Sequence, residues 1–215
     1  MPVTVPCGEA SLPLPLPSDW TLEVEGTVAL PPAQEVKRAV QDALAAPLGA
    51  EPLATRDLTG KRVVVVVDDP QRTTPVDEML PVVLGALERC GAPRESIQVL
   101  MALGLHAPPS EAAARHKLGP ACAAPLSWRP SANRDPERLA LLGRTGAGTP
   151  VVLDEAVVTA DFIVCLGSIF PHALAGCTGG LKALLPGCAA AETIRANHRL
   201  VTTLADVAQT GFSPD

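Results

Sequence analysis

The sequence has 215 residues, of which 47% are hydrophobic, and this proportion fits a globular chain and not a disordered one. A formal net charge of -6, without any cluster of basic residues, argues against nucleic acid or an anionic membrane as the main partner. No apolar run approaches the roughly 18 residues of a membrane-spanning helix. The opening residues do not resemble a signal peptide, so we expect a cytoplasmic protein.

The first predicted elements in chain order are a strand, a helix, a second strand and a second helix. Residues 21–30 alternate polar and apolar side chains and predict a strand, and AQEVKRAVQDALAAP, from Ala33, has the spacing of an amphipathic helix. Val63–Val67 are an unbroken run of β-branched residues, typical of a strand buried on both faces. The next helix is predicted from Val76 to a helix end at Gly91.

The second half of the chain continues the alternation. SIQVLMALG predicts a strand, and SEAAARHKLG predicts a helix with Ser110 as its N-cap. Pro120–Arg138 is irregular and rich in proline, whereas residues 148–169 contain two strand-like runs around a short helix. TGGLKALLPG and AETIRANHRLVTTLADVAQ both predict helices. The alternation predicts an α/β fold with a parallel or mixed sheet flanked by helices.

Side chains capable of chemistry follow three of these strands. Asp69 and Arg72 come after the valine run, His106 follows SIQVLMALG, and His172 follows DFIVCLGSIFP. Each one alone is explained by an ordinary cap, surface cation or structural histidine. Because ligands of open α/β sheets gather at the carboxyl ends of the strands, their convergence favours a functional site. His116 lacks this context, and we expect it on a solvated helix face.

A glycine-rich turn, GCTGGLK, runs from Gly176 to Lys182. Such a turn, entering a helix, exposes backbone N–H groups that suit a phosphate, although the pattern is not a Walker A motif. Lys182 is then either a phosphate partner, a covalent attachment point or an exposed helix lysine. Three histidines could also hold zinc, but the sequence has no HxH or HExxH spacing to favour it.

The segment Leu141–Asn197 resembles the lactate racemase family. It contains, in the family's order, elements similar to LGxTxxGTPV, AD, PHxxAGxxGGxK, LPG and ETIxxNH. DDPQRTTP and GLHAPPSEAAARHKLG resemble two further family segments, DDxTRPxP and GTHRPxTxEE. The resemblance runs from end to end of the chain. It implies that residues 1–215 are the N-terminal, cofactor-binding domain, and that the C-terminal domain that closes the substrate cleft is absent.

The resemblance also implies a cofactor, the nickel-pincer nucleotide, a nickel complex of pyridinium-3,5-bisthiocarboxylic acid mononucleotide. Lys182 matches the family lysine that forms a thioamide link to it, and His198 matches the family histidine that ligates nickel. Thr178, Gly179 and Gly180 lie in the turn expected to contact this cofactor.

The reaction implied is inversion of C2 in a 2-hydroxyacid by reversible hydride transfer to this cofactor. His106 and His172 match the family's acid and base, and Asp69 and Arg72 match its substrate-binding residues. Two enantiomers need two proton-transfer groups with pKa values near neutrality, and an arginine can clamp a carboxylate.

Several residues depart from the family pattern. Gln71 and Thr73 replace the threonine and proline around the arginine, and Leu105 and Ala107 replace a polar and a basic residue. These changes indicate an altered substrate pocket. A racemase or epimerase completed by a second domain or subunit is therefore one hypothesis. The alternatives are a non-catalytic cofactor-binding module or remnant, and a zinc-dependent hydrolase using three histidines.

Overall fold

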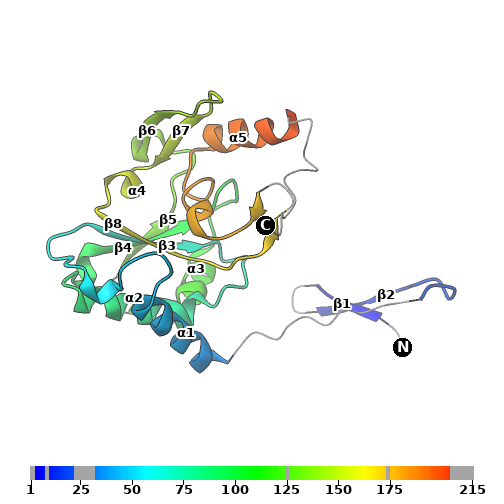
Figure 1. Cartoon of the computed structure of the whole chain (residues 1–215). Helices are drawn as coiled ribbons and strands as arrows, with labels where there is room; N and C mark the ends of the chain where they lie inside the picture. Colours follow the sequence, from blue (N-terminus) through cyan, green and yellow to red (C-terminus); the bar gives the residue numbers. More distant parts are fainter. Residues whose placement is uncertain (1–2, 8–9, 22–31, 124–125, 173–174, 204–215) are drawn as a thin grey trace. The chain divides into compact units, whose positions relative to one another are not determined.

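The structure is a computed structural model that describes residues 3–7, 10–21, 32–123, 126–172 and 175–203 (Figure 1). The chain forms two compact units, residues 1–31 and 32–215. In the first unit, β1 (Val3–Cys7) pairs with β2 (Ala10–Leu14) as an antiparallel hairpin. The strand predicted at residues 21–30 lies almost wholly outside the described residues. No described helix is long and apolar enough to cross a membrane.

The second unit is built on a four-stranded parallel sheet, as the alternation of elements predicts. Its strands are β3 (Val63–Asp68), β4 (Ile97–Ala102), β5 (Ser127–Pro130) and β8 (Phe162–Leu166). Their order is β5-β4-β3-β8, and every pairing is parallel. The valine run is thus an inner strand with a partner on each side, which explains why five successive β-branched residues are all buried.

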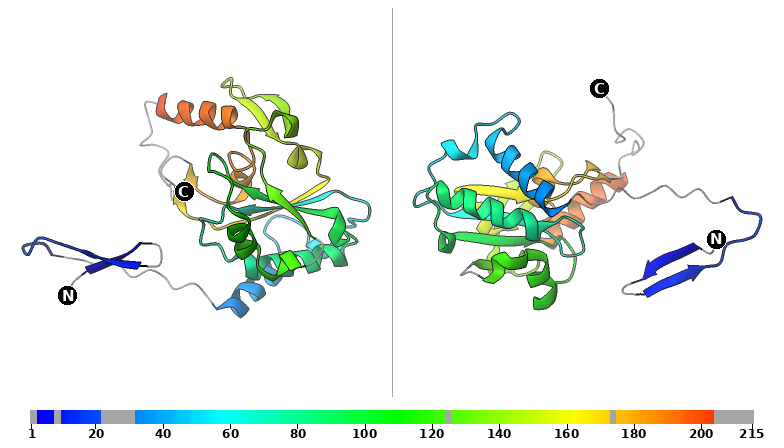
Figure 2. Two further views of the ribbon diagram at one scale, coloured as in Figure 1. Left: turned by 180° about the vertical axis from the view of Figure 1, so that it is seen from behind. Right: turned by 90° about the horizontal axis from the view of Figure 1, so that it is seen from below.

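Helices cover both faces of this sheet (Figures 1 and 2). They are α1 (Ala33–Ala45), α2 (Val76–Arg89), α3 (Glu111–Leu118), α4 (Glu155–Thr159) and α5 (Ala191–Thr203). Val63, Val65 and Val67 pack on the side of α1, α2 and α3, whereas Val64 and Val66 pack against α4 and α5. The period of two in a strand divides the valines between two cores.

Two short hairpins complete the unit. The first pairs β6 (Leu139–Arg144) with β7 (Pro150–Asp154) and has an irregularity at Leu141 and Gly143. The second pairs β9 (Pro171–His172) with β10 (Gly176–Cys177). Short 3-10 turns occupy Leu53–Thr55, Arg94–Ser96, Gly119–Ala123, Pro136–Arg138 and Gly180–Ala183.

Most predicted elements are confirmed, including the cap of α3, where the Ser110 hydroxyl accepts a hydrogen bond from Ala113 N at 3.2 Å. Two predictions were wrong. Residues 120–138 are not wholly irregular, because they contain β5. TGGLKALLPG is not a full helix, because Gly179 and Gly180 adopt positive φ angles of 82° and 53° and Pro186 follows closely.

The strand order creates a switch point between β3 and β8. From β3 the chain extends the sheet through β4 to β5, and it then returns to place β8 on the other side of β3. At such a point the connections leave the sheet in opposite directions and open a crevice at the carboxyl ends of the strands.

Candidate active site

A cleft of about 390 Å³ lies at this switch point, beyond the carboxyl ends of β3, β4 and β8. Every site residue predicted from the sequence lines it: Asp69, Arg72, His106, His172, Thr178, Gly179, Gly180, Lys182 and His198. His116 is exposed on α3, as expected. Apolar residues that the sequence did not single out as site residues also form the wall, among them Leu103, Phe170 and Ile194.

Asp69 and His106 form a hydrogen-bonded pair across the ends of β3 and β4. The Asp69 carboxylate is nearly buried, and its Oδ2 lies 2.6 Å from His106 Nδ1. Its Oδ1 accepts a hydrogen bond from Gln71 N at 2.7 Å. An ionised carboxylate only accepts hydrogen bonds, so His106 Nδ1 is the donor and Nε2 of the neutral ring is left as a proton acceptor.

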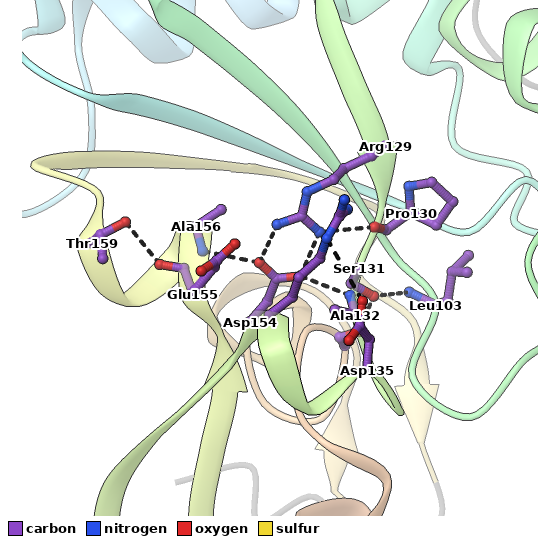
Figure 3. A network of polar contacts seen from close by, with 12 residues as sticks. Leu103, Arg129, Pro130, Ser131, Ala132, Asp135, Asp154, Glu155, Ala156 and Thr159 are labelled. Atoms are coloured by element: carbon purple, nitrogen blue, oxygen red, sulfur yellow. Dashed lines mark hydrogen bonds and ion pairs between the residues drawn. The ribbon is translucent and has the colours of Figure 1, made fainter.

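A buried ion pair supports the segment that carries His106 (Figure 3). Asp154, at the end of β7, is fully buried, and the Arg129 guanidinium donates to both of its carboxylate oxygens at 2.7 Å. Asp154 Oδ2 also accepts from Ala132 N at 2.7 Å. This bidentate geometry fixes the chain as it leaves β5.

Two side chains beyond β5 then hold the loop after β4. The Ser131 hydroxyl accepts from Leu103 N at 3.2 Å and lies 3.3 Å from Gly187 O, to which it donates. The Asn133 amide donates to Gly104 O, and Gly104 N donates to Gly187 O at 2.9 Å. The backbone that leads to His106 is therefore tied to the segment that precedes α5. Sequence reasoning missed this support, because Ser131 and Asn133 lie within residues 120–138, which were expected to be irregular.

His172 lies on β9, and its neutral ring has the opposite tautomer to that of His106. Its Nδ1 accepts a hydrogen bond from Ala175 N at 3.2 Å, so the neutral ring carries its proton on Nε2. Burial lowers the pKa of His172, and the positive charges of Lys182, Arg72 and His198 lower that pKa further. His172 is thus a stronger acid than an ordinary histidine when it is protonated.

The glycine-rich turn is held against the end of β8 by Thr178. The Thr178 hydroxyl donates to Ser168 O at 2.9 Å and accepts from Phe170 N at 2.8 Å, so it is committed to the turn itself. A side chain at Gly179 would come within 3.2 Å of Ser168 O, whereas nothing lies within 4 Å at Gly180. The turn leaves open backbone at Gly180 beside Lys182.

The cleft contains two positive charges, those of Arg72 and Lys182, and its lining also includes the carboxylates of Asp68 and Asp69. Burial and the charge of Arg72 lower the pKa of Lys182, which places the two cations near one another. Lowering the pKa increases the fraction of neutral, nucleophilic amine. Among the described residues, no group of three histidine, cysteine or acidic side chains could hold a metal ion, so the three-histidine zinc site is not formed.

Together these features define a class: a parallel α/β protein with a cleft at the switch point of its sheet, lined by histidines, an arginine and a lysine. Residues 7–211 match the model of the lactate racemase N-terminal domain, and the chain belongs to that family. The family implied by the sequence motifs is thereby confirmed.

Individual relatives agree with this assignment. The lactate racemase of Thermoanaerobacterium thermosaccharolyticum is 27% identical over 202 residues, which are 91% of this chain and 46% of that protein. The lactate racemase of Lactiplantibacillus plantarum is 28% identical over 159 residues, or 74% of this chain and 37% of that protein. The chain therefore spans less than half the length of these curated relatives.

Solved structures also resemble this chain over less than half of their own length. The lactate racemase apoprotein from T. thermosaccharolyticum superposes with a TM-score of 0.71 at 26% identity, over 92% of this chain and 46% of that one. A protein from Thermotoga maritima has a TM-score of 0.62 at 21% identity, over 79% of this chain and 41% of that one, and shares the fold.

Proposed function

We propose that this chain is the cofactor-bearing half of a 2-hydroxyacid racemase or epimerase that inverts C2 by reversible hydride transfer to a covalently bound nickel-pincer nucleotide. The observation that carries the proposal is the meeting of His106, His172, Arg72 and Lys182 around one cleft. A family whose named relatives are lactate racemases supports the same reaction.

The residues fit this cofactor. Lys182 would hold it covalently, and the lowered pKa of its amine favours the neutral form that such a bond needs. His198, on α5, would be the nickel ligand, since imidazole suits nickel. The open backbone at Gly180 would approach the phosphate. When bound, the nucleotide supplies an electron-poor acceptor for the hydride of C2.

The chain's own residues would bind the substrate and move its proton. Arg72 offers two parallel donors to the substrate carboxylate. His106, held by Asp69, takes the hydroxyl proton of one enantiomer at Nε2. His172, when protonated, returns a proton for the other enantiomer, and its lowered pKa eases that donation. The two histidines exchange roles when the reaction runs in reverse.

The substrate would be a small 2-hydroxyacid, and the catalytic unit would include a second domain or subunit. Leu105, which stands where the family pattern has a polar residue, lines the cleft with Leu103 and Phe170. An apolar wall favours an apolar substituent at C2. Lactate, the substrate named for the relatives, is the first compound to assay.

The test is cofactor loading in cells that make the cofactor. Lys182→Arg keeps the positive charge but cannot form the thioamide link, so the mass increase of the loaded protein and most of its nickel should be lost. Intact-mass spectrometry and metal analysis measure both. Lys61→Arg, an exposed lysine, is the matched control and should load normally. An unchanged mass increase and full nickel content in Lys182→Arg would rule out the cofactor assignment.

Histidine variants separate the remaining roles. His198→Ala should keep the organic adduct and lose nickel, because it removes one ligand only. His106→Ala and His172→Ala should keep both adduct and nickel and should stop catalysis in a completed enzyme. Loss of nickel in all three variants would instead point to a three-histidine metal site.

A further inference from the structure

Lys117 is a buried lysine that does not line the cleft. It lies on α3 with Ala114 and Leu118 on the inward face, while its neighbours Arg115 and His116 are exposed. Its side chain is only 7% exposed. A buried ammonium group is costly unless hydrogen bonds and an opposite charge compensate for lost water, so its surroundings should be specific.

The ammonium group donates two hydrogen bonds to backbone carbonyls and forms one ion pair. Lys117 Nζ lies 2.9 Å from Asp68 Oδ1, 2.8 Å from Arg72 O and 2.9 Å from Thr74 O. Asp68 Oδ1 is buried and makes no hydrogen bond within the described residues, so the ion pair with Lys117 is what compensates its charge. All three oxygens belong to the loop of residues 68–74.

The same loop is tied to β8 at its far end. Asp68 Oδ2 accepts a hydrogen bond from the Thr74 hydroxyl, which lies 2.6 Å from Ser168 Oγ. Thr74 is buried, and Ser168 lines the cleft just beyond β8. Lys117, Asp68, Thr74 and Ser168 therefore connect α3 to the switch point of the sheet.

The loop carries the two site residues that follow β3. Asp69 accepts from Gln71 N at 2.7 Å through Oδ1, and its backbone carbonyl accepts from Arg72 N at 2.9 Å. Lys117 donates to the carbonyl of Arg72, and in the turn held in this way Asp69 Oδ2 reaches His106 Nδ1.

We propose that Lys117 is a positioning residue, whose buried ammonium holds the 68–74 loop so that Asp69 keeps His106 in its Nδ1–H tautomer and Arg72 stays at the cleft. The use of Arg72 to bind a substrate rests on the proposed function. The tautomer of His106 does not, because it depends only on contacts within this chain.

The test is the tautomer of His106 in the full 215-residue chain. Nitrogen-15 NMR of the histidine rings at alkaline pH distinguishes Nδ1–H from Nε2–H, and His106→Gln assigns the signals. The wild type should hold His106 mainly as Nδ1–H. Lys117→Met removes all three donors, and the ratio of the two tautomers should shift toward Nε2–H by about tenfold, the factor that one charge-assisted hydrogen bond supports.

Two control variants separate positioning from stability. Lys37→Met removes another lysine ion pair, that between Lys37 on α1 and Glu78 on α2 at 2.8 Å. Val83→Ala lowers stability from a fully buried position on α2. Both should leave the His106 tautomer as in the wild type. An unchanged tautomer in Lys117→Met, with only a lower unfolding midpoint, overturns the proposal.

Lys117→Arg provides the test if Lys117→Met does not fold. It keeps the buried charge, but a planar guanidinium cannot direct its donors at the same three oxygens. The same shift toward Nε2–H is expected, and a wild-type tautomer in this folded variant contradicts the positioning role. None of these spectra requires cofactor, so a failure of Lys182 loading and a failure of this proposal are distinguished.

Discussion

Lys182 and Arg72 place two positive charges in one cleft, where the two charges repel each other. Burial is the larger cause that lowers the pKa of Lys182, and the Arg72 charge is the next. In the chain without a bound ligand, this repulsion stabilises neither charge. An anion bound between them would relieve the repulsion, so the part of the cleft between Lys182 and Arg72 favours a negatively charged group.

The pKa of Lys182 can be measured from its rate of acylation. Labelling with an amine-reactive ester as a function of pH, followed by mass spectrometry, should give Lys182 a midpoint below the ordinary lysine value of 10.5. Arg72→Gln should raise that midpoint, because removing a nearby positive charge stabilises the protonated amine. Arg62→Gln, at the opposite end of β3, should leave it unchanged. A midpoint that does not respond to Arg72→Gln contradicts the proximity of the two charges.

Strand ends converge whatever the details of packing, so the sequence was sufficient to bring Asp69, Arg72, His106 and His172 to one cleft. The other five site residues came from the glycine-rich turn and from the resemblance to the family. The sequence could not predict the partners of these residues. His106 meets Asp69 across 37 positions, and Lys117 meets Arg72 across 45. Only the spacing of Lys117 from Ala114 hinted at its burial, since residues three apart share a helix face.

Among the secondary-structure elements, β5 is held by the buried pair of Arg129 and Asp154. Asp154 is fully buried, and the Arg129 side chain is 16% exposed. The same carboxylate also accepts from Ala156 N at 3.0 Å and so begins α4. One acidic residue therefore joins β5, β7 and α4 on the side of the sheet that supports the His106 loop (Figure 3).

Asp154→Asn should strongly destabilise the chain. The substitution keeps the shape of the side chain but leaves Arg129 buried without its counter-charge, which typically costs about 3–5 kcal/mol. Urea unfolding measures the loss, and amide hydrogen exchange at Leu103 should accelerate as its support from Ser131 loosens. Asp42→Asn, in an exposed helical pair with Arg38, should change little. Equal unfolding midpoints for the two variants would show that the buried pair has no structural role.

The elements that the sequence predicted correctly are those with a strong period. The valine run and the amphipathic pattern of α1 and α2 have one plausible conformation each. In contrast, β5 contains Arg129 and ends at Pro130, and proline is confined to sheet edges, which is where β5 lies. Its pairing with β4 decides its conformation, and no local pattern could reveal that.

At the scale of the whole molecule, the mouth of the cleft is open to water in the described residues. Phe170 and the side chain of His106, which line the cleft, are 46% and 43% exposed. Ile169 and Leu181, next to lining residues in the sequence, are 76% and 79% exposed. Exposed apolar residues around a functional cleft favour association with another surface. The relatives are about twice as long as the part that this chain matches.

We therefore expect the 215-residue chain alone, after cofactor loading, to racemise lactate poorly. An open cleft neither excludes water nor orders the substrate, and loss of such ordering costs on the order of 10²-fold in rate. Turnover should recover when the chain is joined to the C-terminal half of a lactate racemase. Turnover equal to that of a full-length relative, from a monomer of verified mass, would contradict this expectation.

The place of β3 in the sheet also has a consequence for synthesis on the ribosome. The strand ends at Asp68, and its partner β4 begins at Ile97, but its other partner, β8, begins only at Phe162. Until that residue has been added, one edge of a five-valine strand presents unpaired N–H and C=O groups to other nascent chains. A stalled ribosome would leave this apolar, β-branched strand half covered, so timely completion of the chain is itself a safeguard against aggregation.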